Sequence, residues 1–60
     1  MKKYYMIHDV QSGLYLQAMP NIHFVPANEA ETWPTEQSAE EWLLECDLGG
    51  SYIIILPVYM

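Results

Sequence analysis

Basic residues are almost absent from this chain of 60 residues. Lys2 and Lys3 are its only basic side chains, against eight acidic ones, and the formal net charge is -6. Nucleic-acid backbones and anionic membranes are bound by clusters of Lys and Arg, so we expect no direct binding to nucleic acid or membrane. A protein partner with a basic surface remains compatible with this charge.

Cysteine and long apolar runs are also scarce. Cys46 is the only cysteine, which excludes an internal disulfide and fits a reducing cytoplasm, where we expect the protein to act. His8 and Asp9 interrupt the apolar stretch that a signal peptide needs after its lysines. The longest apolar run, 52–60, is far shorter than a membrane helix, so we expect a strand there.

Patterns typical of catalytic and metal sites are missing as well. His8, His23 and Cys46 do not fall in any CxxC, HxxxH or HExxH spacing. Cys46 is expected near a helix C-terminus, where the dipole disfavours a reactive thiolate. We therefore expect neither an enzyme nor a metal or cofactor site.

What the chain does contain is enough apolar surface to fold. Hydrophobic residues make up 52% of the sequence, which excludes a disordered chain and predicts a single domain over 1–60. A domain this small has little core, and with no disulfide or metal it is expected to gain stability by oligomerisation.

Residues 3–10 and 14–18 have the composition of strands, and Gln11, Ser12 and Gly13 suit a hairpin turn between them. If Val10 lies opposite Leu14, alternation predicts two faces for this hairpin. The predicted core face holds Tyr4, Met6, His8, Val10, Leu14, Leu16 and Ala18. The predicted open face holds Tyr5, Ile7, Asp9, Tyr15 and Gln17. It is more apolar than is usual for a surface that binds no partner.

The middle of the chain predicts a short edge strand at 22–25, a loop at 27–33 and then the helix. Thr35 is the expected N-cap and Gly49-Gly50 the expected stop. A core-facing stripe is formed by Ala39, Trp42, Leu43 and Cys46. The opposite side carries Glu36, Glu40, Glu41 and Glu45 around Leu44, which is either an ordinary solvated surface or an acidic docking surface.

Residues 51–58 predict a strand buried in the middle of a sheet or between layers, with pairing limited near Pro57. After a helix, such a strand is expected beside the first strand and parallel to it, through a right-handed crossover. The predicted class is α+β, with an antiparallel or mixed sheet of three or four strands in the order ββ(β)αβ and one helix packed on one face.

The order of short motifs resembles a group of small phage and prophage proteins. The motifs are Gly13-Leu14-Tyr15-Leu16 in the hairpin, A-x-x-W-x-T from Ala30 to Thr35, and A-x-x-W-L from Ala39 to Leu43. The resemblance implies the ββ(β)αβ pattern and no catalytic residue. In size and acidity the chain is also similar to phage-borne inhibitors of host defence, some of which imitate nucleic acid.

These observations predict a non-catalytic protein-binding module. The expected partner is either a second copy of the chain or a basic host protein, and the alternatives are a nucleic-acid mimic and a purely structural homodimer. The expected interaction residues are Tyr5, Ile7, Tyr15, Glu36, Glu40, Glu41, Leu44 and Glu45.

Overall fold

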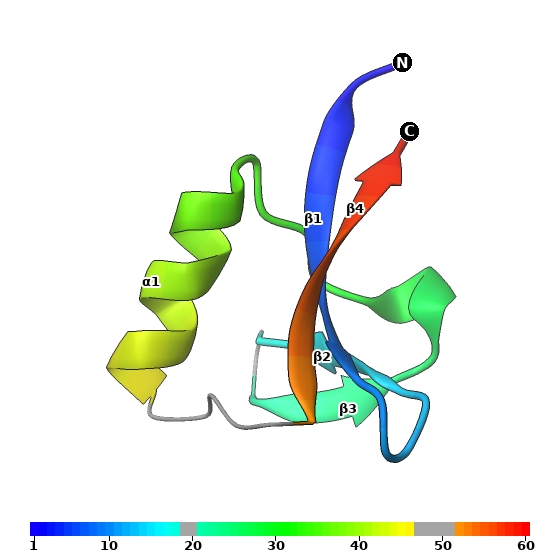
Figure 1. The fold of residues 1–60 in the computed structure, drawn as a ribbon. Helices are drawn as coiled ribbons and strands as arrows, with labels where there is room; N and C mark the ends of the chain where they lie inside the picture. Colours follow the sequence, from blue (N-terminus) through cyan, green and yellow to red (C-terminus); the bar gives the residue numbers. More distant parts are fainter. Residues whose placement is uncertain (19–20, 47–51) are drawn as a thin grey trace.

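The computed structural model describes residues 1–18, 21–46 and 52–60, in which four strands form one sheet and one α-helix packs against it (Figure 1). The elements are β1 Lys3–Asp9, β2 Tyr15–Gln17, β3 His23–Val25, the 3-10 helix η1 Ala27–Glu29, α1 Glu36–Cys46 and β4 Ile53–Tyr59. The predicted α+β class, element order and single-sided helix are confirmed.

The sheet has the order β3-β2-β1-β4, and its neighbouring strands are antiparallel. β3 is an edge strand and β4 lies beside β1, both as predicted. The expected parallel direction of β4, its crossover and its central position are wrong, because β4 is antiparallel to β1 and lies at the other edge of the sheet. The reason is the segment after β3, which brings the chain back to the N-terminal half of β1 before α1 begins (Figure 1).

That returning segment was expected to be a loop, but it has defined structure. Residues 27–29 form η1, and Trp33 forms a β-bridge with Tyr5. The main-chain N–H of Glu31 also donates to the Leu16 carbonyl, at 3.0 Å. The segment thus continues the pairing of β1 beyond the end of the short strand β2.

The hairpin differs from the prediction by one residue of register. His8 lies opposite Tyr15, and the Asp9 N–H donates to the Leu14 carbonyl at 2.9 Å, so the loop contains four residues instead of three. The Asp9 carboxylate accepts hydrogen bonds from the Gln11 N–H and the Ser12 hydroxyl, both at 3.0 Å. These bonds draw the residue after Asp9 into the turn, as Asp commonly does at the start of a turn.

A shift of one residue moves every side chain of a strand to the other face. Ile7, predicted on the open face, is therefore fully buried against the helix side together with Leu16. The core cluster comprises Ile7, Leu16, Trp33, Ala39 and Leu43, with Trp42, Ile53 and Ile55 packed around it. The predicted core positions Tyr4, Met6, His8 and Val10 instead project from the opposite face.

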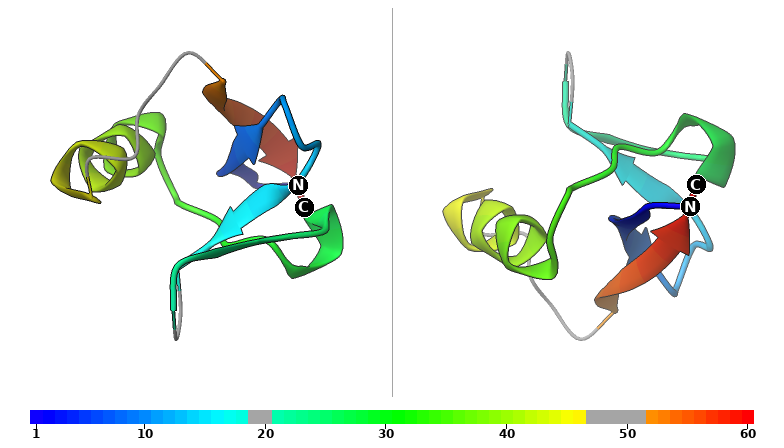
Figure 2. Two further views of the ribbon diagram at one scale, coloured as in Figure 1. Left: turned by 90° about the horizontal axis from the view of Figure 1, so that it is seen from below. Right: turned by 90° about the horizontal axis from the view of Figure 1, so that it is seen from above.

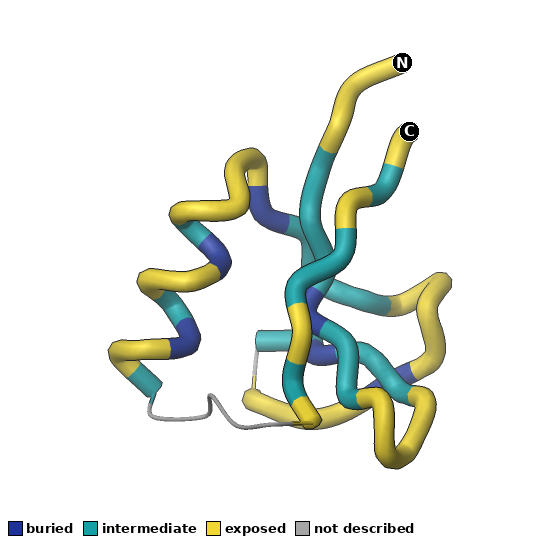
Figure 3. Tube along the Cα trace, in the orientation of Figure 1, coloured by how far each residue is buried: buried dark blue, intermediate teal, exposed yellow. Residues whose placement is uncertain are grey.

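The helix begins where its sequence predicts. The Thr35 hydroxyl accepts a hydrogen bond from the Ser38 N–H at 3.1 Å, and the Ser38 hydroxyl donates to the Thr35 carbonyl at 2.8 Å. Ala39 and Leu43 are buried on the sheet side, while the outer turns are exposed (Figure 3). The predicted stop at Gly49-Gly50 lies outside the described residues.

Pro57 does not limit the pairing of β4, which extends to Tyr59, and Lys2 and Met60 exchange two further hydrogen bonds of 2.8 and 2.9 Å. Residues of an antiparallel ladder alternate in whether their main-chain groups point toward the partner strand. Lys2 and Met60 form a hydrogen-bonded pair, and every second pair along the ladder does the same. The pair of Tyr5 and Pro57 falls between two such pairs, so the Pro57 nitrogen is directed away from β1. An edge strand tolerates proline at such a position because no ladder bond is lost.

Candidate protein-binding surface

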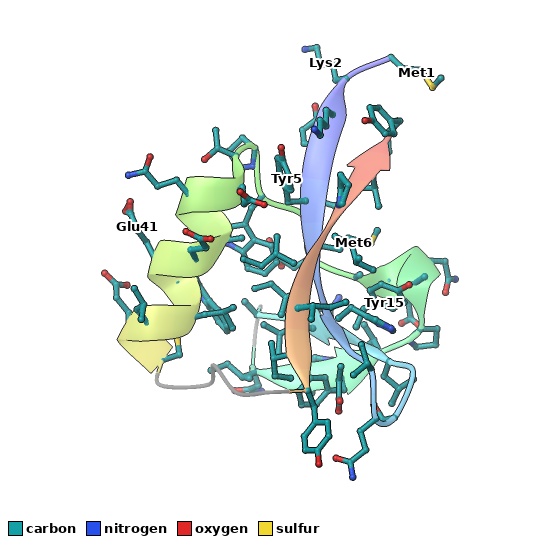
Figure 4. The ribbon with its side chains drawn as sticks, viewed as in Figure 1. Met1, Lys2, Tyr5, Met6, Tyr15 and Glu41 are labelled. Atoms are coloured by element: carbon teal, nitrogen blue, oxygen red, sulfur yellow. The ribbon has the colours of Figure 1, made fainter. Side chains whose placement is uncertain are left out.

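The β1 and β4 strands present a second face, on the side of the sheet away from α1. Ile7 of β1 and Ile55 of β4 lie opposite each other and pack in the helix-side core. The residues before and after each of them along its strand therefore point to the other side of the sheet. Figure 4 shows this division, with Tyr5 on the helix side of β1 and Met6 on the other. The two views of Figure 2 confirm that α1 covers one side only.

We call this second surface the open face and define it by the outward side chains of β1, β4 and the neighbouring part of β2. We include Val10, which follows β1 and whose N–H donates to the Tyr52 carbonyl at 2.9 Å. Its members are Tyr4, Met6, His8, Val10, Tyr15, Ile54, Leu56 and Val58. Val10 is 48% exposed and Ile54 is 39% exposed, and the other members are half-buried. The open face is therefore a nearly continuous apolar surface in contact with solvent.

Part of the same side is covered by the chain itself. Tyr15 lies opposite Val25, which is only 7% exposed, and the Gln17 side-chain amide donates to the Glu29 carbonyl at 3.0 Å. η1 lies on this side of the sheet (Figure 1). η1 thus lies beside the open face, on the same side of the sheet.

Two polar members of the open face, His8 and Tyr15, contact each other. The Nδ1 atom of His8 is 3.0 Å from the Leu14 carbonyl, and the His8 ring stacks on Tyr15 with centroids 4.4 Å apart. These contacts hold both rings in place. A side chain held in this way loses little conformational entropy when a partner binds.

Of the predicted interaction residues on the sheet, Tyr15 alone belongs to the open face. Ile7 is buried in the core, so the prediction that it is an interaction residue is wrong. Tyr5 lies on the helix side, where its ring centroid is 5.5 Å from the Lys3 ammonium. Hydrogen bonding and charge interaction with Tyr5 raise the pKa of Lys3 above its usual 10.5, with a smaller contribution from Tyr59.

The acidic residues of α1 are exposed. Glu36, Glu40, Glu41 and Glu45 are all exposed, and Leu44 retains 80% of its exposure. Leu44 follows Glu40 by four residues and Glu41 by three, so it shares the helix surface with both. This acidic surface is on the side of α1 that faces away from the sheet. The open face is on the other side of the sheet.

The histidines and the cysteine lie apart in the described residues. Within 1–18, 21–46 and 52–60, no group of His, Cys, Asp and Glu side chains has a geometry for a metal ion, and no pocket is found. His23 is exposed, with Nδ1 2.6 Å from the Asn21 carbonyl, and Cys46 is half-buried with a free thiol. None of the helices described is long and apolar enough to cross a membrane.

No family model matches the chain. No curated protein and no solved structure matches it either.

Three apolar members of the open face were assigned to the core from the sequence alone. They are Tyr4, Met6 and Val10. The signal that identifies them is Asp9, which is followed by Ser12 three positions later. This spacing favours an Asp-initiated turn and hence the four-residue loop.

Proposed function

We propose that this protein is a non-catalytic binding module that holds a protein partner on the open face. The observation that carries the proposal is a mostly apolar surface on the side of the sheet away from α1. Val10 and Ile54 are exposed there, and the other members are half-buried. Contiguous apolar surfaces of this kind mark interaction sites in small soluble domains.

The chemistry of the open face defines the partner that it suits. Tyr4, Met6 and Tyr15 belong to residue types that are enriched at protein interfaces. The open face has no Lys, Arg, Asp or Glu among its members. Binding through it should depend on apolar burial and change little with salt. We place this activity in a cytoplasm, which suits a chain with a single free cysteine.

A second candidate function is supported by the exposure of Leu44 among carboxylates. In this alternative the chain is a phage-type inhibitor, and its acidic helix occupies the basic groove of a nucleic-acid-binding host protein. Such binding is expected to weaken steeply as salt rises, because it depends on charge attraction.

Site-specific photo-cross-linking in the producing cell separates the two candidates. p-Benzoylphenylalanine replaces Ile54 on the open face in one variant and Leu44 on α1 in the matched control. Both positions are exposed apolar sites, at 39% and 80%, so each should accept the larger side chain. Cross-linked species are then identified by mass spectrometry.

The proposed function predicts a discrete protein cross-link from position 54 and none from position 44. Cross-links from position 44 alone would favour the acidic inhibitor and overturn the proposal. Failure of both positions to capture any protein, including the chain itself, would overturn both candidates.

A further inference from the structure

We propose that the occupant of the open face is a second copy of this chain, packed face to face about a two-fold axis. This inference rests on the proposed function and specifies its partner. It follows from where the charges lie, from how little core the monomer has, and from the position of Pro57.

The charges favour a neutral, self-complementary contact. The exposed carboxylates of α1 lie on the outer side of the helix, with the sheet between them and the open face (Figure 4). Two copies joined through their open faces would therefore keep their acidic helices on opposite outer sides. A basic partner would find no carboxylate among the members of the open face, although Glu29 is exposed on the neighbouring η1.

The core of the monomer is small for a stable domain. Among the described residues, Ile7 and Leu16 are the large side chains with less than 2% exposure. Domains of this size usually need a disulfide, a metal or a partner subunit, and one cysteine provides no internal disulfide. A second copy is present wherever the chain is made, and it would convert the open face into a second core layer.

A face-to-face dimer of the usual interface size would extend beyond the open face, because most members of that face are half-buried. Stable interfaces bury about 800 Å² on each partner. The chain exposes 4138 Å², so such an interface would use roughly a fifth of its surface. Two sheets packed through their apolar faces form the sandwich arrangement common among antiparallel sheets.

The edge of β4 is the competing site for a second copy, and Pro57 argues against it. Main-chain groups of Ile53, Ile55 and Tyr59 point outward on this edge, as does the nitrogen of Pro57. Because Pro57 has no N–H, a strand that paired with the outer edge of β4 would lack one main-chain hydrogen bond within the ladder. Proline is one of the residues by which proteins protect edge strands from pairing.

Sedimentation equilibrium of the purified full chain tests the inference, from micromolar to millimolar concentration. The wild-type chain is expected to sediment at twice its monomer mass. Ile54→Glu places a carboxylate on the open face and should weaken the dimer by at least about 100-fold. Leu44→Glu makes the same change of charge on α1, and should leave the dimer constant within about threefold.

Val10→Glu provides a second variant on the open face, because Val10 is 48% exposed and its replacement leaves the core intact. Circular dichroism of each variant establishes that it is folded. The dimer should also hold or tighten as salt rises from about 0.1 M to about 1 M, because screening reduces repulsion between two chains of charge -6.

A chain that stays monomeric at millimolar concentration would overturn the second copy as occupant. If position 54 then cross-links a foreign protein in cells, the proposed function stands without this inference. If position 54 captures nothing, the proposed function and this inference both fail. A dimer that persists in folded Ile54→Glu and Val10→Glu, or that dissociates with salt, would also overturn the face-to-face assignment.

Discussion

Trp33 and Tyr5 exchange two main-chain hydrogen bonds, with N···O distances of 2.8 and 2.9 Å. This pair joins the segment that enters α1 to the N-terminal half of β1. The Trp33 side chain, only 9% exposed, packs in the core and lies 5.6 Å from the Trp42 ring, centroid to centroid. One residue therefore closes the sheet edge and supports the helix.

Trp33→Ala should cost about 3–5 kcal/mol of unfolding free energy, because it removes the largest side chain of the core cluster. A domain this small has little more stability than that, so the variant is expected to be largely unfolded at 25 °C. Urea unfolding followed by circular dichroism measures the change. A loss below about 1 kcal/mol would contradict this role for Trp33.

Ile7→Ala and Val10→Ala together test the hairpin register. Ile7 is fully buried and Val10 is 48% exposed, so the first should lose about 2–5 kcal/mol and the second less than about 1 kcal/mol. Urea unfolding at low concentration keeps any self-association from masking the difference. The opposite ranking would restore the register in which Val10 faces Leu14.

Gly13→Ala tests the turn, since Gly13 has a φ of 80°. A Cβ at this position meets no atom within 4 Å, so the cost is conformational, about 1–2 kcal/mol. Gly13→Asn is the control, because Asn enters the left-handed region more readily and should lose less. Equal losses for Ala and Asn in thermal unfolding would point to a cause other than backbone conformation.

Thr35→Ala should destabilise the chain by about 1 kcal/mol, because the Ser38 N–H loses its hydrogen-bond acceptor at the helix N-terminus. Thr35→Ser keeps the hydroxyl and should retain most of the stability. Chemical denaturation of the two variants beside the wild type provides the comparison. If the serine variant is as unstable as the alanine variant, the hydroxyl is not the stabilising group.

Pro57→Ala should promote strand addition at the free edge of β4, because it supplies an outward N–H where the wild type has none. We expect faster thioflavin-T-positive aggregation at equal concentration, with the pairing of β1 and β4 retained. Pro26→Ala, at an exposed proline outside the strands, is the matched control. Aggregation at the wild-type rate would show that Pro57 does not protect this edge.

Local patterns predicted the elements well. Thr35 identified the helix start, Ala39 and Leu43 its buried side, and Gly13 the turn. Each of these signals acts within a few residues, through a cap, a helical period or a backbone angle, so the sequence expresses it directly.

The amino-acid sequence by itself determined an acidic α+β domain without a disulfide, with its hairpin, its helix and a terminal apolar strand. The tertiary structure decided which side of β1 is buried and in which direction β4 runs. One extra residue in the Asp9 turn exchanged the faces of β1, and the Trp33–Tyr5 bridge set the antiparallel direction of β4. The Trp33–Tyr5 bridge joins distant parts of the chain, which no local pattern predicts. The turn is local, but the alternation within a strand is the same in either register, so the apolar pattern of β1 does not distinguish the two.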